Sequence, residues 1–223
     1  MNTGGGTVAA SQEIARMVDD FDSDKPIVVS MGDTTASGGY YIASQADRIV
    51  AQPGTLTGSI GVIWTTFDYA GLLDKVGIEL DTVTAGKHKD MFLPGRMTPE
   101  RRLIVQNLVD DSYEQFVAAV VNGRGLTDAA VRSLATGQLY TGEDALRLRL
   151  VDELGGLEKA IKEAERLAGV TNAQIIEPTP SIWDAFFGGP GINSLSETVG
   201  AFLIGPDVLV LREFLNSYPS LRY

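Results

Sequence analysis

Apolar residues recur along most of the chain with two different periods, and each period predicts one kind of secondary structure. Apolar positions three or four residues apart, separated by charged positions, are typical of amphipathic helices, whereas short runs of β-branched residues are typical of buried strands. The predicted helices are residues 11–21, 40–46, 68–76, 98–122 and 156–168. The predicted strands are residues 27–29, 48–51, 59–65 and 80–84. Strands that alternate with helices in this way predict an α/β layered domain.

One long segment, residues 85–97, follows neither period and contains two glycines and one proline, which predicts a loop. Long ordered loops often carry functional residues, so this loop is a candidate part of a site. Thr127 and Thr141 each precede a helical pattern and are candidate N-caps for the helices that follow them.

The composition changes after residue 177, where prolines and the run Gly-Gly-Pro-Gly at 188–191 predict a linker. Two short apolar segments that follow the linker predict helices. We therefore expect residues 1–177 to form the α/β domain and residues 178–223 to form a linker and a helical carboxyl-terminal extension.

The charge and the residue counts exclude several classes of function. The chain has 223 residues, with 18 Lys+Arg against 29 Asp+Glu, a formal charge of −11 that disfavours nucleic acid as a partner. Cysteine is absent and histidine occurs once, as His88, which leaves no cysteine or histidine-rich metal site. We expect no metal and no cofactor. No signal peptide or membrane-spanning run is visible, so the chain as printed is expected to be soluble.

A candidate nucleophile lies between a predicted buried strand and a predicted helix, at Ser37 in the run Thr-Ala-Ser-Gly-Gly. Such a corner exposes a hydroxyl, and the N–H groups at the helix amino end can stabilise an oxyanion. Gly38 would let a substrate carbonyl approach the backbone. The alternative interpretation is a serine that only caps the helix. The pattern differs from the G-x-S-x-G elbow because Thr35 occupies the first glycine position.

A second glycine cluster, residues 2–6, precedes the first helix. It lacks the Gly-Lys-Ser/Thr ending of a phosphate-binding loop, so nucleotide binding is disfavoured. Two glycine corners before two helices could instead supply two oxyanion N–H donors.

A serine nucleophile needs a base, and the loop at 85–97 holds the candidates Lys87, His88 and Lys89. A lysine works as a base only when its amine is unprotonated, which requires burial to lower its pKa from about 10.4. From the residues alone, both lysines are also compatible with solvated surface charges. Ser59 could hydrogen-bond a buried amine, or it could be a simple strand-end hydroxyl.

Five segments in order resemble the signal peptide peptidase A family, also called protease IV, of the ClpP/crotonase-like superfamily of serine proteases. The matching segments are NTGGGTVAASQEI, TTASGGYYIAS, GTLTGSIGVI, AGKHKDM and GQLYTGEDALRLRLVDELGG, and their spacing also resembles that of the family. The resemblance implies a ClpP/crotonase-like α/β layered fold.

The resemblance also implies a serine endopeptidase that hydrolyses hydrophobic peptides, such as signal-peptide remnants, with a Ser-Lys dyad. Ser37 would be the nucleophile, Lys89 the base and Ser59 the hydroxyl that orients the lysine. Gly38 and Gly5 would donate to the oxyanion.

The family further implies a homo-oligomeric ring or dome on the extracytoplasmic face of a membrane. Strands expected before Asn2 and a membrane anchor are not in this sequence, so we expect an amino-terminally truncated domain whose membrane association uses a segment outside it. The chain departs from the family at residues 3–6, where Ser-Pro-Gly-Gly is usual, and at Arg149, where glycine is usual. Two alternatives stay open: a crotonase-like acyl-CoA hydratase or hydrolase, and a noncatalytic oligomeric scaffold.

Overall fold

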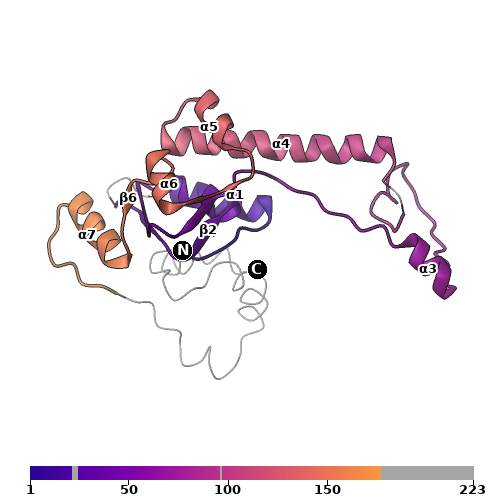
Figure 1. The fold of residues 1–223 in the computed structure, drawn as a ribbon, viewed down its shortest axis with the longest axis horizontal. Helices are drawn as coiled ribbons and strands as arrows, with labels where there is room; N and C mark the ends of the chain where they lie inside the picture. Colours follow the sequence, from indigo (N-terminus) through magenta and orange to yellow (C-terminus); the bar gives the residue numbers. More distant parts are fainter. Residues whose placement is uncertain (22–24, 96, 177–223) are drawn as a thin grey trace, which may run out of the picture. The chain divides into compact units, whose positions relative to one another are not determined.

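The computed structural model describes residues 1–21, 25–95 and 97–176 (Figure 1). The chain divides into two compact units. The first unit contains residues 1–61 and the chain from residue 116 onward, and the second contains residues 62–115. Each unit is described by itself.

The first unit contains a parallel sheet built from the most buried apolar residues. Its strand order is β1 (Val28–Met31), β3 (Arg48–Ala51) and β6 (Glu153–Leu154). Both pairings are parallel, with Val29 opposite Ile49. Ile49, Val50 and Ala51 are fully buried, as is typical of the strands of a parallel sheet.

A second sheet of the first unit has the order β2 (Thr34–Ala36), β4 (Leu56–Gly58) and β5 (Leu139–Thr141). Strands β2 and β4 are parallel, whereas β4 and β5 are antiparallel. Thr3 forms an isolated parallel bridge with Thr35, so the amino-terminal glycine cluster begins at the edge of this sheet.

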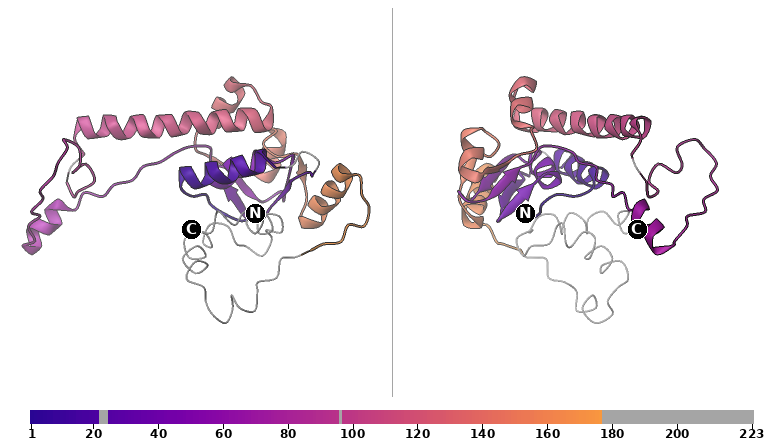
Figure 2. Two further views of the ribbon diagram at one scale, coloured as in Figure 1. Left: turned by 180° about the vertical axis from the view of Figure 1, so that it is seen from behind. Right: turned by 45° about the vertical axis from the view of Figure 1, so that its right-hand side comes forward.

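Helices surround these strands in the first unit: α1 (Val8–Asp19), α2 (Gly38–Ala43), α5 (Asp128–Leu134), α6 (Gly142–Arg147) and α7 (Leu157–Ala168). Helix α1 packs against α2, and α7 packs against β1 and β3. Figure 2 shows α1, in indigo, beside the violet strands from two further directions. Helix α4 (Pro99–Arg124) begins in the second unit and ends in the first.

The predicted α/β class is confirmed, as are most of the predicted helices. Thr127 and Thr141 are N-caps: their hydroxyls accept from the N–H groups of Ala130 and Asp144, at 3.2 and 3.1 Å. The predicted domain boundary near residue 177 and the predicted carboxyl-terminal helices lie outside the described residues.

Two predicted strands are wrong. Residues 59–65 form no strand, because the strand in this region is β4, which ends at Gly58. Residues 80–84 form no strand either. The β-branched residues there predict strands, but a strand also needs a partner for its backbone N–H and C=O groups. Among the described residues, no strand pairs with 80–84, and backbone hydrogen bonds to Gly137 and Gln138 reach only Ser59 and Ile60 of the other segment.

The second unit has almost no core. It holds α3 (Ala70–Val76), the loop at 85–97 and the start of α4, and Val105 is the one buried residue among those described in it. Large apolar side chains are exposed instead, most of all Val83 at 96% and Ile63 at 88%. No helix among the described residues is long and apolar enough to cross a membrane.

Candidate active site

Ser37 occupies a strained corner between β2 and α2. Its backbone has φ 53° and ψ −123°, in a region that L-residues other than glycine rarely adopt. A non-glycine residue in such a conformation costs on the order of 1–3 kcal/mol and persists only where its surroundings impose it. The Ser37 N–H donates to the Gly58 carbonyl at 2.9 Å, and the side chain makes no capping hydrogen bond with α2. The half-buried hydroxyl is therefore not used to cap the helix.

Gly5 lies directly against this corner. A Cβ added at Gly5 would lie 2.7 Å from Ser37 Cβ and 2.8 Å from the Gly38 nitrogen, and Gly5 has φ 109°. Only glycine fits, because a side chain would collide with the serine and would also strain the backbone. The structure thus brings together three of the predicted site residues, Ser37, Gly38 and Gly5.

The N–H groups near Ser37 differ in what they bind. Gly38 is the first residue of α2, where an N–H has no intrahelical acceptor. The Gly5 N–H donates to the Thr3 hydroxyl at 3.2 Å. The Gly6 nitrogen lies 3.0 Å from the position that a Cβ of Gly38 would take. Sequence reasoning did not separate Gly6 from its neighbours, because three consecutive glycines give no signal of which N–H faces the corner.

Ser59 follows β4 as Ser37 follows β2. Ala36 and Gly58 are register partners in the parallel pair β2–β4, so the two serines leave neighbouring strands at the same level. Ser59 has φ 50°, is half-buried, and its hydroxyl donates to the Gly137 carbonyl at 3.4 Å. The carboxyl ends of parallel strands are where α/β sheets commonly place ligands.

A cluster of buried polar groups anchors α2 through the side chain of Tyr40. The fully buried Tyr40 donates its hydroxyl to the Leu150 carbonyl at 2.9 Å, and burial raises the pKa of Tyr40. Asp152 accepts from the Ile49 N–H at 2.7 Å and from Arg124 at 2.8 Å. The LVDELGG motif therefore connects the strands and α4 to the helix that follows Ser37.

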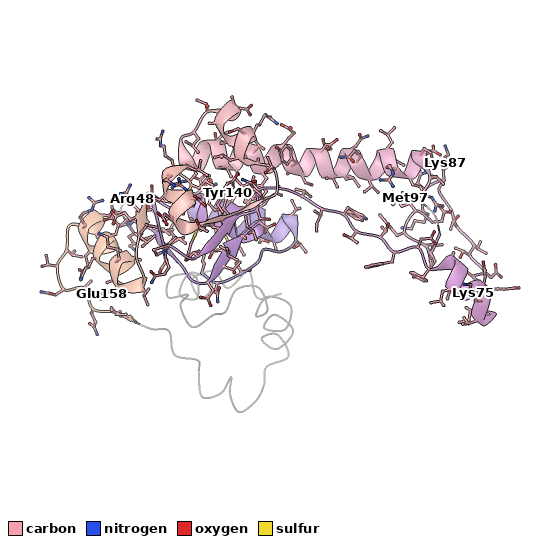
Figure 3. The ribbon with its side chains drawn as sticks, viewed as in Figure 1. Arg48, Lys75, Lys87, Met97, Tyr140 and Glu158 are labelled. Atoms are coloured by element: carbon pink, nitrogen blue, oxygen red, sulfur yellow. The ribbon has the colours of Figure 1, made fainter. Side chains whose placement is uncertain are left out.

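Arg48 and Glu163 extend this cluster to α7. Arg48, which Figure 3 labels, contacts Asp152 at 3.5 Å and Glu163 at 3.0 Å. The Arg166 hydrogen bond, assisted by Arg48, lowers the pKa of the buried Glu163 to about 2. Sequence reasoning missed this cluster, because nothing in the spacing of these charges predicts that they meet.

The loop at 85–97 folds as a series of turns, and ion pairs fix both sides of Lys89. Lys87 pairs with Glu100 at 2.6 Å, and His88 lies 3.8 Å from the same carboxylate. The hydrogen bond from Lys87 lowers the pKa of Glu100. On the other side, Asp90 pairs with Arg101 at 2.5 Å. Figure 3 labels Lys87 beside the start of α4.

Lys89 itself is exposed and makes no side-chain hydrogen bond or ion pair with any described residue. It belongs to the second unit, whereas Ser37, Ser59, Gly38 and Gly5 belong to the first. The contact between Ser37 and Lys89 therefore stays a prediction.

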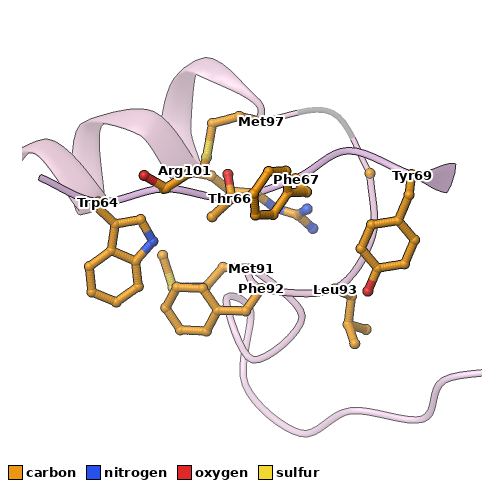
Figure 4. A pocket seen from close by; sticks show the side chains of 11 residues that line it. Trp64, Thr66, Phe67, Tyr69, Met91, Phe92, Leu93, Met97 and Arg101 are labelled. Atoms are coloured by element: carbon orange, nitrogen blue, oxygen red, sulfur yellow. The ribbon is translucent and has the colours of Figure 1, made fainter. Parts of the chain in front are cut away.

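A pocket of about 370 Å³, lined by both apolar and polar residues, lies between residues 64–69 and 91–101 (Figure 4). The rings of Trp64 and Phe92 stack within it, with centroids 5.3 Å apart. The pocket is also lined by Phe67, Tyr69 and Met91, among others. Sequence reasoning treated this stretch only as a loop, although the run Met-Phe-Leu after Asp90 was a possible signal. No cluster of acidic or histidine side chains suited to a metal ion occurs among the described residues.

Comparisons with known proteins identify the family of this chain. A family model described as Peptidase family S49 matches residues 19–171. An inferred signal peptide peptidase SppA of Enterococcus faecium is 38% identical over 179 residues, which are 79% of this chain and 52% of that protein. The chloroplastic serine protease SPPA of Arabidopsis thaliana is 32% identical over 208 residues, 89% of this chain and 31% of that protein. The chain thus spans about half of the first relative and about a third of the second.

A solved structure of a probable enoyl-CoA hydratase/isomerase from Mycobacterium abscessus is 14% identical to this chain. The TM-score is 0.40, and the match covers 74% of this chain and 46% of that one. This likeness concerns the fold alone and carries no functional argument.

The family model that matches this α/β domain defines the class of this protein as a peptidase-type domain. The chain belongs to peptidase family S49, the signal peptide peptidase A family. The family predicted from the five sequence segments is confirmed.

Proposed function

We propose that this protein is a serine endopeptidase in which Ser37 is the nucleophile and Lys89 is the base. The backbone of Ser37 carries this proposal: a serine held at φ 53° between a strand and a helix, with its hydroxyl not used as a cap. Strain of this kind at a half-buried strand-to-helix corner points to a functional role. The names of the S49 relatives, which are proteases, support the same reaction class.

The reaction divides into acylation and deacylation. The neutral amine of Lys89 takes the hydroxyl proton as Ser37 Oγ bonds to the peptide carbonyl carbon. Collapse of the tetrahedral intermediate breaks the C–N bond, and the ammonium returns the proton to the leaving amine. A water molecule, deprotonated by the same amine, then hydrolyses the ester and restores Ser37.

The oxyanion would be stabilised by backbone N–H groups beside Ser37. Gly38 supplies one. Gly5 was the predicted second donor, and its N–H is engaged by Thr3 at 3.2 Å, which supports Gly6 as a further candidate. The close contact of Gly5 with Ser37 then shapes the corner whichever N–H donates.

Two contacts support Lys89 over the other candidate bases. Lys87 donates to the Glu100 carboxylate, so its amine is already engaged in an ion pair. His88 lies near the same carboxylate. Lys89 has no carboxylate in contact among the described residues, but it is exposed, so its desolvation requires closure of the site by substrate or by another part of the assembly.

We propose that the substrates are hydrophobic peptides, such as signal-peptide remnants, and that the protein acts as a homo-oligomeric ring or dome on the extracytoplasmic face of a membrane. The aromatic and aliphatic part of the pocket lining, which includes Trp64, Phe67 and Phe92, supports apolar substrate side chains. The exposed apolar residues of the second unit, including Ile63 and Val83, support self-association, because burying them against a second copy would remove apolar side chains from water. Light scattering of the wild type and of Ile63→Asp/Val83→Asp tests this: dissociation is expected in the variant.

Labelling with a fluorophosphonate, read by peptide mass spectrometry, tests the serine mechanism. We expect modification of Ser37 in the wild type, none in Ser37→Ala, and strongly slowed modification in Lys89→Ala. Ser133→Ala, which changes an exposed serine of α5, should label as the wild type does. Turnover of acyl-CoA without labelling would support the hydratase alternative, and an intact oligomer without label or peptidase activity would support the scaffold.

A further inference from the structure

The residues on either side of Lys89 both form ion pairs with the first turn of α4. In one pair the loop supplies the cation, and in the other it supplies the carboxylate. On one side Lys87 donates to Glu100, and on the other Arg101 donates to Asp90. Asp90 is the next residue after Lys89 and is the acidic group closest to it along the chain. A carboxylate at the amine would favour the ammonium form, which cannot act as a base.

We infer that Arg101 is a positioning residue that holds the Asp90 carboxylate away from the amine of Lys89 and so preserves its free-base form. This inference rests on the proposed role of Lys89 as the base.

The geometry of the pair supports this role. Arg101 Nη2 lies 2.5 Å from Asp90 Oδ2, and its side chain is only 22% exposed, so the pair is partly shielded from solvent. The Arg101 N–H donates to the Thr98 hydroxyl at 3.2 Å, which fixes the helix start from which the guanidinium extends. The N–H of Leu93 donates to the Asp90 carbonyl at 3.0 Å, so the backbone of Asp90 is also held in a turn.

The other charged groups around the loop do not replace Arg101. Glu100 is occupied by Lys87 and lies near His88. Arg102 follows Arg101 on α4, is exposed, and makes no ion pair among the described residues. Asp74 and Lys75 of α3 likewise make no described ion pair with the loop. Arg101 is thus the one cation paired with Asp90 among the described residues.

The test is the pH profile of kcat/KM with a fluorogenic leucine-containing peptide, for the wild type, R101Q and D90N/R101Q. In R101Q the freed Asp90 should move the ionisation of the base upward by about one pH unit, the lower end of the effect of a nearby opposite charge. Because Arg101 also lines the pocket, the readout is the shape of the profile: kcat/KM should fall about tenfold more below that ionisation than at the high-pH limit. Adding D90N should restore the wild-type profile.

The matched control is R102Q, which removes the same charge from the neighbouring position but breaks no ion pair. It should keep the wild-type profile. Competitive acetylation of lysines, read by mass spectrometry at Lys89, measures the ionisation of the amine without relying on turnover. If R101Q does not fold, R101M takes its place, since it keeps the aliphatic stem without the charge.

An equal loss at every pH in R101Q, or a loss that D90N does not rescue, would show that Arg101 only holds the loop together and would overturn the inference. A shift in R102Q as large as in R101Q would overturn it too. Failure of the proposed function gives a different result. If Lys89 is not the base, Lys89→Ala will keep the kcat/KM of the wild type.

Discussion

Ser37 and Ser59 leave two neighbouring parallel strands at the same level, one residue beyond the register pair Ala36 and Gly58, and both have positive φ. The Ser37 N–H also donates to the carbonyl of Gly58, the residue before Ser59. Two serines of different strands are therefore fixed relative to each other by backbone hydrogen bonds. This relation follows from pairing between strands and does not depend on side-chain packing.

The backbone strain at Ser37 predicts that replacing this serine by glycine removes activity but costs less stability than replacing it by alanine. Glycine accepts positive φ, so Ser37→Gly should abolish hydrolysis and yet be more stable than Ser37→Ala by up to about 1 kcal/mol. Urea unfolding of both variants measures the difference. The control is Ser133→Gly in α5, which should lose about 0.5 kcal/mol because glycine is the poorer helix former. If Ser37→Gly were the less stable of the two corner variants, the serine would not be strained.

The contact of Gly5 with the corner predicts that adjacent glycines differ in their tolerance of a methyl group. Gly5→Ala places a Cβ within 3 Å of Ser37 Cβ and of the Gly38 nitrogen, and should lower kcat/KM at least tenfold and lower Tm. Gly4→Ala meets no atom within 4 Å and should change kcat/KM less than twofold. Peptide hydrolysis assays compare the two. Equal effects at both positions would mean that the glycine cluster does not shape the site.

The sequence predicted the parts of the fold that local rules determine. The N-caps Thr127 and Thr141 and the strand at 48–51 formed as expected, because capping and a short apolar run are local properties. Strands at 59–65 and 80–84 did not form, since pairing depends on a partner that local sequence does not specify.

In the site, too, the features that depend on local sequence were predicted and the contacts between distant residues were not. The glycines around Ser37 were predicted from the sequence and meet in the structure. The cluster of Arg48, Asp152 and Glu163 joins residues more than a hundred positions apart, and no periodicity of charge indicates such a contact. The pairing of Asp90 with Arg101 was also not predicted, although the proposed mechanism required Asp90 to point away from Lys89.

Arg149 has φ 63°, at the position where the family resemblance leads us to expect glycine. Arg149→Gly should therefore raise the free energy of unfolding by up to about 1 kcal/mol, because the left-handed conformation costs an L-residue roughly that much. Arg149→Ala keeps the same penalty and should give no gain. Arg147→Gly, within α6, should be destabilising. Chemical denaturation ranks the three, and a gain in Arg149→Ala would point to charge rather than backbone strain.

The lowered pKa of Glu163 predicts how stability depends on pH. Its folded-state pKa of about 2 lies below the unfolded value of about 4.3, so the ionised form favours the folded state. The stabilisation is present above about pH 5 and is lost as pH falls toward 2. Glu163→Gln should be less stable than the wild type at neutral pH, and the difference should shrink through this range.

Thermal unfolding between pH 2 and pH 7 measures that difference. Glu158→Gln is the control, because Glu158 lies on the same helix but its side chain is 84% exposed and pairs only with Lys162 in the described structure. It should change Tm much less. A pH-independent difference between the wild type and Glu163→Gln would mean that Glu163 stabilises the fold by packing alone.

Ser59 and Ser37 follow neighbouring strands at the same end of the sheet, which predicts that substitutions of Ser59 change the pH dependence of kcat/KM by different amounts. If Ser59 orients the amine of Lys89, kcat/KM should rise with pH along one ionisation well below the model lysine value of about 10.4, and Ser59→Ala should lower activity without removing it. Ser59→Asp should move that ionisation to higher pH and depress activity at neutral pH, because a carboxylate favours the ammonium form. Steady-state kinetics from pH 5 to pH 10 tests this, with Ser133→Asp, an exposed position of α5, as the control for added charge. A wild-type profile that stays flat across this range would contradict a lysine base, since a free amine cannot be equally available at every pH.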